Sequence, residues 1–156
     1  LMGDRANATF VMQLRRMSMD DLADVLQVEN AGYSHPWSEG VMRGCVRMGY
    51  DMWVGEVDDV IRAHAVIQMM VDEAHLLNVC VHPAFQRNGY GQQMLTHVIE
   101  RAGEMGAHRI ILEVRPSNKG AVKMYYAAGF ERIGVRKGYY PGEDVREDAW
   151  VLSIYI

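Results

Sequence analysis

The sequence lacks long hydrophobic runs, a disulfide framework and an excess of basic residues, and each absence argues against a class of protein. Its apolar runs extend over only a few residues, far short of the ~20 that cross a bilayer, so we expect no membrane span. The two cysteines, Cys45 and Cys80, lie far apart, which favours reduced thiols in the cytoplasm over a disulfide. With a formal net charge of -4, the chain has no basic stripe for neutralising phosphates, so nucleic-acid binding is not expected.

Metal and nucleotide motifs are missing as well. The six histidines show neither His-Glu-x-x-His spacing nor an accompanying Cys-x-x-Cys pair, so we predict no metal site. The chain has no Gly-Lys-Ser/Thr of a P-loop, and no third glycine near Met94 that a dinucleotide-binding fingerprint would need. The common nucleotide-binding motifs are therefore excluded.

Internal repeats, low-complexity segments and interdomain linkers are also absent. A length of 156 residues suits one hydrophobic core, so we predict a single domain over residues 10–156. Residues 1–9 show no periodic pattern, and Leu1 before Met2 is typical of a cloning remnant or a processed start. We predict a disordered or non-native segment there. The oligomeric state is left open, and a monomer fits the sequence.

The chain does show the hydrophobic periodicities that are typical of strands and of amphipathic helices. Strands are predicted over Phe10–Arg15, Met52–Glu56, Ile61–Met70, Glu73–His82, Arg109–Val114, Phe130–Arg136 and about Asp148–Tyr155. Helices are predicted from Asp20 or Asp21 through Glu29, from Ser38 to about Met48, over Gly89–Gly106, and from Ser117 or Asn118 to Gly129, with a loop at Gly138–Gly142. Three meandering strands followed by a right-handed crossover predict a three-layer α/β domain, a mixed sheet covered by helices.

The segment Gln86–Gly91 joins a buried strand to the most regular of these helices. A glycine-containing turn before a helix brings unpaired backbone N–H groups and the positive end of the helix dipole to one point. Such a turn predicts an anion site, although by itself it is equally typical of a plain tight turn. The surrounding sequence has to decide between the two.

Further motifs supply that context. The Gln86-x-x-Gly-x-Gly91 pattern, the segment Glu113–Asn118, and Tyr125 followed by Ala128-Gly129-Phe130 together resemble the GNAT family of N-acetyltransferases. The likeness extends from about residue 12 to residue 155. Within the family it is strongest to bacterial members that acetylate the N-terminal alanine of a small-subunit ribosomal protein. The segments that carry this finer likeness are His35–Glu39, Leu77–Val79, Tyr139–Pro141 and Arg146–Ala149.

The resemblance implies a particular architecture and cofactor. The mixed, mostly antiparallel sheet would splay between the two parallel strands that end at His82 and Val114, leaving a V-shaped slot for the pantetheine arm of acetyl-CoA. The residues implied to bind acetyl-CoA are Val79, Cys80 and Val81 through their backbone, then Gln86, Arg87, Asn88, Gly89, Tyr90 and Gly91 around the pyrophosphate, and Asn118. An oxyanion donor is expected in a backbone N–H near Val79, where family members bulge the strand.

Two side chains are assigned to the chemistry. Glu113 lies in an apolar strand, where partial burial would raise its pKa and suit it to act as general base. Tyr125 follows Asn118 by two helical turns, so both would face the slot, and its hydroxyl would protonate the leaving thiolate. The alternatives are a structural carboxylate for Glu113 and a core aromatic for Tyr125, with neighbouring Tyr126 assigned to packing.

The resemblance implies that the acceptor is the N-terminal alanine amine of a ribosomal protein. An α-amine also suits a modest carboxylate base, because its reference pKa of about 7.7–8.0 lies well below that of lysine. Candidate acceptor-binding residues are Trp37, Tyr139, Tyr140 and Glu147. Other readings stay open, namely acetylation of a lysine or a small metabolite, or a silent acyl-CoA-binding module. A covalent intermediate on Cys80 is disfavoured because no partner histidine is evident and the strand context is typical of a core thiol.

Overall fold

The computed structural model describes residues 11–156, so the expectation for residues 1–9, and Phe10 in the first predicted strand, lie outside the described residues. Within them the strands are β1 (Gln13–Arg16), β2 (Asp51–Val57), β3 (Val60–Met70), β4 (Glu73–Val81), β5 (Arg109–Val114), β6 (Glu131–Tyr140) and β7 (Glu147–Tyr155). The helices are α2 (Leu22–Gly32), α3 (Glu39–Arg47), α4 (Tyr90–Glu104) and α5 (Lys119–Ala127), with single 3₁₀ turns η1 (Met19–Asp21) and η2 (Pro83–Phe85). No helix among residues 11–156 is long and apolar enough to cross a membrane.

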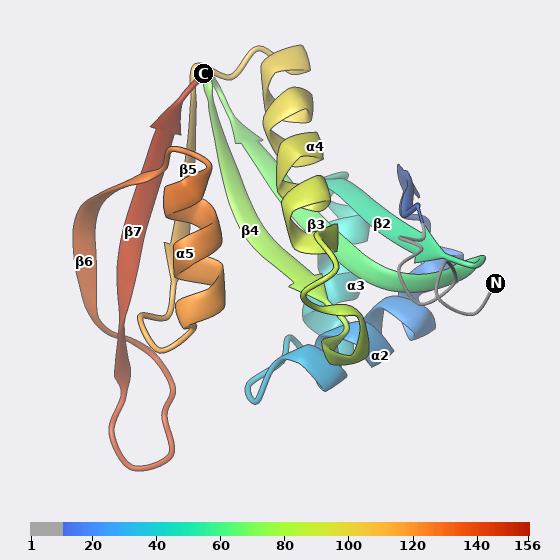
Figure 1. Ribbon diagram of the computed structural model, residues 1–156, viewed down its shortest axis with the longest axis horizontal. Coiled ribbons are helices and arrows are strands. Elements are labelled where there is room, and N and C mark those ends of the chain that lie inside the picture. Colours follow the sequence, from blue (N-terminus) through green and yellow to red (C-terminus); the bar gives the residue numbers. More distant parts are fainter. Residues whose placement is uncertain (1–10) are drawn as a thin grey trace, which may run out of the picture.

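The seven strands form one sheet in the order β1-β2-β3-β4-β5-β7-β6. Every neighbouring pair is antiparallel except β4 and β5, which are parallel. Helices α4 and α5 lie on one face of the sheet, and α2 and α3 lie on the other (Figure 1). This is the three-layer mixed-sheet architecture that the sequence predicted, so the fold class is confirmed.

The β2–β3 hairpin shows why local sequence and structure agree in the first half of the sheet. Asp58 and Asp59 at its tip have φ angles of 52° and 63°, which is the geometry of the tight turn that matches the twist of two antiparallel strands. Aspartate tolerates this left-handed region better than most residues. Strand β2 extends the predicted Met52–Glu56 by one residue at each end, and β3 extends the predicted Ile61–Met70 by one residue at its start.

Helix α4 fixes one face of the sheet. Its inward side chains recur at helical spacing, and Met94, Leu95, Val98 and Ala102 are all at most 1% exposed. Full burial of a large apolar side chain contributes roughly 1.5–3 kcal/mol, so this stripe is a main stabilising contact of the domain. The predicted helix over Gly89–Gly106 is confirmed with slightly shorter ends.

The parallel strands separate partway along their length. Pairing of β4 with β5 extends only from Glu73 opposite Arg109 to Leu76 opposite Leu112. At that point Leu77 has no partner on β3, because Ile67 pairs with Leu76 and Val66 with Asn78, which makes Leu77 a β-bulge. A bulge bends its strand and increases the local twist. Figure 1 shows the two strands diverging from there, so the predicted splay is confirmed.

Strand β6 corrects one prediction. We expected a strand over Phe130–Arg136 and a loop at Gly138–Gly142, but β6 continues to Tyr140. The pairing of β6 with β7 is irregular between Arg136 and Tyr140, and Gly138 adopts a φ of 57°. The backbone N–H of Gly138 donates to Asp148 Oδ1 at 2.9 Å, which holds the strand in place across the irregularity.

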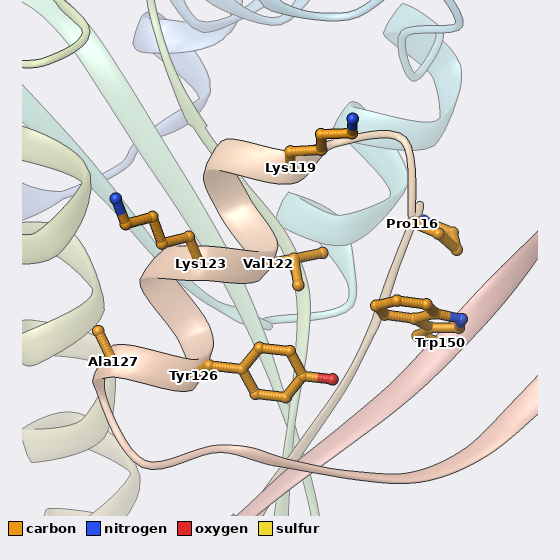
Figure 2. A pocket seen from close by; sticks show the side chains of 7 residues that line it. All are labelled: Pro116, Lys119, Val122, Lys123, Tyr126, Ala127 and Trp150. Atoms are coloured by element: carbon orange, nitrogen blue, oxygen red, sulfur yellow. The ribbon is translucent and has the colours of Figure 1, made fainter.

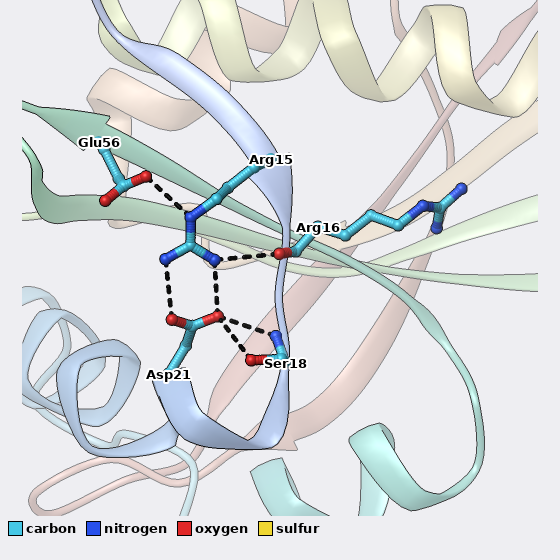
Figure 3. A network of polar contacts seen from close by, with 5 residues as sticks. All are labelled: Arg15, Arg16, Ser18, Asp21 and Glu56. Atoms are coloured by element: carbon cyan, nitrogen blue, oxygen red, sulfur yellow. Dashed lines mark hydrogen bonds and ion pairs between the residues drawn. The ribbon is translucent and has the colours of Figure 1, made fainter.

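A polar network joins the first strand to the first helix (Figure 3). Arg15 donates to both carboxylate oxygens of Asp21 at 2.8 Å, and its Nε donates to Glu56 Oε1 at 2.8 Å. The Arg15 hydrogen bond outweighs the effect of burial and lowers the pKa of Asp21 to about 2. The network therefore ties β1, η1 and β2 together on the side of the sheet far from the splay.

Candidate active site

The predicted anion-binding loop lies where β4, α4 and α5 meet. Arg87 and Gly89 both have positive φ angles, 67° and 79°, so the chain reverses sharply before α4 begins at Tyr90. A Cβ built on Gly91 would lie 3.2 Å from Met124 Sδ of α5, which shows how closely the two helices approach. The first N–H groups of α4 lack partners within the helix, and a backbone cradle of this kind suits an anion.

The side chains of this loop hold the loop itself. Gln86 Nε2 donates to the Val81 carbonyl at 3.1 Å, and Asn88 Nδ2 donates to the carbonyls of Phe85 and Gln86, each at 3.2 Å. Tyr90 is 3% exposed and belongs to the core. Of the residues predicted to bind the pyrophosphate, these three have internal structural roles, and their backbone N–H groups are what they would offer a ligand.

Where β4 separates from β5, its edge turns backbone N–H and C=O groups toward the gap. His82 N donates to Arg62 O of β3 at 2.8 Å, and because antiparallel bonding alternates, Cys80 also turns its backbone toward β3 while Val79 and Val81 turn theirs toward the gap. The Tyr33 hydroxyl donates to the Val79 carbonyl. Val79 and Val81 are therefore the members of the predicted trio whose backbone faces the slot.

Cys80 itself points away from the gap. Its thiol contacts the Val28 carbonyl at 3.6 Å, and burial raises its pKa to about 12. A thiol with that pKa is a poor nucleophile at neutral pH. The location supports direct transfer over a covalent intermediate on Cys80.

Glu113 lies on β5 just past the last residue paired with β4. Its side chain is 8% exposed, its Oε2 lies 2.6 Å from His75 Nε2, and its Oε1 lies 3.3 Å from Arg136 Nε. We expected burial to raise its pKa. Burial does act in that direction, but the hydrogen bond and charge of His75, together with Arg136, outweigh it and hold the pKa below its usual value. The expectation of a raised pKa was therefore wrong, because two partners from distant strands were not visible in the sequence.

Three tyrosines converge on the slot from different elements. Tyr125 of α5 is 5% exposed and packs edge-on against Phe130, with ring centroids 5.6 Å apart. Burial, with a further contribution from Tyr140, raises the pKa of Tyr125 above its usual value. Burial also raises the pKa of Tyr140, and the neighbouring charge of Glu113 adds to it. Tyr140 thus lies within electrostatic reach of both residues assigned to the chemistry, and all three hydroxyl groups, including that of Tyr33, stay protonated at neutral pH.

Asn118 and Glu147 organise the segment between β5 and α5. Asn118 is the N-cap of α5, and its Oδ1 accepts from Ala121 N at 3.3 Å. Glu147 accepts from Arg115 at 3.0 Å and from the backbone and hydroxyl of Ser117, each at 2.9 Å. Both side chains have structural partners, and their predicted contacts with acetyl-CoA and acceptor stay predictions.

The aromatic candidates for acceptor binding lie in two separate parts of the structure. Trp37 packs against the cluster under α2 and α3, and its backbone N–H donates to Glu29 Oε2 at 3.0 Å. Tyr139 and Tyr140 form an edge-to-face pair with centroids 4.9 Å apart. The Arg136 guanidinium lies 5.6 Å from the Tyr139 ring centroid, so this pair is continuous with the Glu113 cluster.

Tyr125 and Tyr126 lie on different sides of α5, and Tyr126 lines a surface pocket. Tyr126 is 43% exposed and lines a pocket with Trp150 of β7, Val122 and Pro116, together with two lysines of α5 (Figure 2). Tyr126 therefore points away from the core that contains Tyr125. The sequence assigned Tyr126 to packing, and its ring lies half-exposed in a surface pocket with Val122 and Trp150.

A second carboxylate cluster lies behind β4, and sequence reasoning missed it. Glu29 of α2 is 1% exposed; its Oε1 lies 2.9 Å from His64 Nε2 and accepts from Asn78 Nδ2 at 3.0 Å. Glu29, His64 and Cys80 each place a potential metal-ligating atom within 4.8 Å of the others. Both Glu29 oxygens are, however, used by hydrogen bonds, and the cluster is part of the core.

His75 and Arg136 were also missed. His75 of β4 pairs with Ile111 of β5. Glu113 is two residues further along β5, so its side chain lies on the same face of the sheet as that of Ile111. That register is set by the parallel pairing and is not readable from either segment alone. Arg136 of β6 reaches Glu113 of β5 across β7, which pairs with both strands, and that strand order is not readable from the sequence of β6 alone.

Comparison with known proteins now identifies the family. The family model described as "Acetyltransferase (GNAT) family" matches residues 14–130. The [ribosomal protein bS18]-alanine N-acetyltransferases of Salmonella typhimurium and Haemophilus ducreyi are 36% and 38% identical to this chain, over 90% and 87% of it and 95% and 94% of their own lengths. The crystal structure of the Escherichia coli ribosomal-protein-S18-alanine N-acetyltransferase matches with a TM-score of 0.88 and 32% identity, covering 94% of each chain. The chain belongs to the GNAT family of acetyltransferases.

Proposed function

We propose that this protein transfers the acetyl group of acetyl-CoA to the N-terminal α-amine of a peptide that begins with alanine, in the manner of its ribosomal-protein relatives. The observation that carries the proposal is the placement of Glu113 at the point where β4 and β5 separate, with a partner on each carboxylate oxygen, beside the buried Tyr125 of α5. A reaction that removes one proton and delivers another needs a base and an acid at one slot.

The residues around the slot fit acetyl-CoA. The reversal at Arg87 and Gly89 presents backbone N–H groups of the α4 N-terminus, which suit a pyrophosphate. Val79 and Val81 turn backbone groups toward the gap, as an added strand would require. Bound acetyl-CoA would supply an activated carbonyl carbon with a thiolate as leaving group.

The protein's side chains would manage the protons. As the amine nitrogen bonds to the carbonyl carbon and the C–S bond breaks, one amine proton passes to Glu113, directly or through water. The Tyr125 hydroxyl, kept protonated by burial, donates its proton to the departing sulfur. Solvent then returns the proton from Glu113 to Tyr125, so the residues end the cycle as they began it.

The choice of acceptor rests on the relatives, whose names specify the alanine of ribosomal protein bS18, and on the slot. Tyr139 is half-exposed, and its ring contacts Arg136, the partner of Glu113, so it is suited to holding an extended peptide. This reaction belongs in the cytoplasm, where ribosomal proteins and acetyl-CoA meet.

A direct assay tests the proposal. The protein is incubated with acetyl-CoA and either a basic peptide beginning with alanine or its N-blocked, lysine-containing counterpart, and acetylated peptide is measured by mass. We expect acetylation of the α-amine and its loss in Glu113→Gln and Tyr125→Phe, with Tyr126→Phe as the matched control. Acetylation of the lysine peptide alone would favour another amine, and acetyl-CoA binding without any turnover would favour a silent module.

A further inference from the structure

The Glu113 carboxylate is already paired at both oxygens before any substrate binds. His75 Nε2 of β4 lies 2.6 Å from Oε2, and Arg136 Nε of β6 lies 3.3 Å from Oε1. The Glu113 side chain is 8% exposed, whereas those of His75 and Arg136 are 21% and 55% exposed. Both partners are more exposed than the carboxylate they hold, and they lie on strands that flank β5 and β7.

These partners change what can approach Glu113. Arginine is charged at every physiological pH, so a protonated amine entering the slot meets a positive charge beside a carboxylate that already has one partner on each oxygen. The other ionisable group facing Glu113 is Tyr140, which is neutral at physiological pH because burial raises its pKa. An ammonium group therefore meets a carboxylate whose charge is already partly balanced by Arg136.

The same partners limit the strength of the base. They hold the pKa of Glu113 below its usual value, whereas an α-ammonium has a reference pKa of about 7.7–8.0 and a lysine ammonium about 10.4. Glu113 is thus far too weak to deprotonate either ammonium before attack. It is strong enough to take the proton from a nitrogen that has already bonded to the carbonyl carbon, because that nitrogen has become acidic.

We infer that His75 and Arg136 are positioning residues that make this site select amines by their neutral fraction, and so favour α-amines over lysine side chains. The inference rests on the proposed function and adds a source of specificity to it. At neutral pH, a difference of about 2.5 in pKa between the two amines corresponds to roughly 300-fold in neutral fraction. This difference in neutral fraction favours the α-amine independently of any contact with the rest of the peptide.

The pH dependence of kcat/KM in the intact protein tests this. With the alanine-starting peptide and with the N-blocked lysine peptide, log kcat/KM should rise with a slope of one until the pH reaches the pKa of each amine. A plateau that begins well below the amine pKa would show that the protein accepts the ammonium form, and would overturn the inference even though the α-amine is acetylated. If the α-amine is not acetylated at all, the proposed function itself fails.

Variants assign the effect to the two residues. His75→Gln, Arg136→Gln and the double variant should lower the preference for the α-amine over lysine at pH 7, by at least threefold in the double variant. The plateau should then extend to lower pH. Lys137→Gln is the matched control, because Lys137 pairs with Asp148 at 3.2 Å and not with Glu113, and it should leave the preference unchanged. Equal losses with both acceptors and an unmoved pH profile, in variants whose thermal unfolding shows them folded, would mean that the two residues are merely structural.

Discussion

Two carboxylate–histidine pairs lie on either side of strand β4, and they differ in what surrounds them. Glu29 and His64 are 2.9 Å apart, and each side chain is 1% exposed. Glu113 and His75 are 2.6 Å apart, and their side chains are 8% and 21% exposed. The first pair is sealed beneath α2 and α3, whereas the second opens onto the gap between β4 and β5.

The difference shows that a histidine–carboxylate contact does not define an active site. Glu29 also accepts from Asn78 and from the backbone of Trp37, so its hydrogen bonds connect a helix, two strands and a loop. Glu113 has partners that reach solvent, and it stands beside Tyr140 at the splay. The sealed pair holds the β4 bulge and the loop between α2 and α3, while the open pair has access to a reacting proton.

The largest expected effect comes from replacing the open carboxylate. Glu113→Gln keeps the size and a hydrogen-bonding group but removes the base, and general-base catalysis contributes about 10²–10⁴-fold. We expect kcat with the alanine-starting peptide to fall by that factor, with little change in the thermal midpoint. An activity loss below tenfold would remove Glu113 from the role of base.

The sealed carboxylate should show the opposite pattern. Glu29→Ala leaves His64 and Asn78 buried without their partner, and breaking a buried pair from one side costs about 3–5 kcal/mol. For a domain of this size that lowers the thermal midpoint by about 6–20 °C, and Glu29→Gln should lower it less. In the Gln variant we expect the KM for peptide to rise more than the KM for acetyl-CoA, because Trp37 loses its anchor. Unchanged stability in both variants would contradict the structural role.

The sequence predicted one member of the open pair, Glu113, but not its partners His75 and Arg136. The apolar run around Glu113 marked the residue, and the family likeness gave it a role. Its partners are brought to it by the pairing of β4 with β5 and by the placement of β7 between β5 and β6, and both are long-range features. Glu29 escaped notice because a carboxylate on an amphipathic helix looks like a solvent-facing residue, and only the bulge at Leu77 brings Asn78 to it. The helices and the hairpin were predictable because their signals are local.

The smallest effect is expected at a third carboxylate, Asp21, which lies on the side of the sheet far from the splay. Asp21 pairs with Arg15, and the pairing lowers its pKa from 3.8 to about 2. Because the folded-state pKa is depressed, the stabilisation is fully present above about pH 3.8 and is lost as the pH falls toward 2. The Arg15 side chain is 43% exposed, so solvent screening limits the contribution to about 1 kcal/mol.

Asp21→Asn should therefore lower the free energy of unfolding at pH 7 by about that amount, measured by urea denaturation, and leave kcat unchanged. The difference from the unsubstituted protein should shrink as the pH is lowered toward 2, where Asp21 is half protonated. Asp20→Asn, at the exposed neighbouring position, is the control and should show no comparable pH-dependent difference. A loss of stability that persists unchanged at pH 2 would mean that Asp21 stabilises the fold through shape and capping of η1, and that its charge contributes nothing.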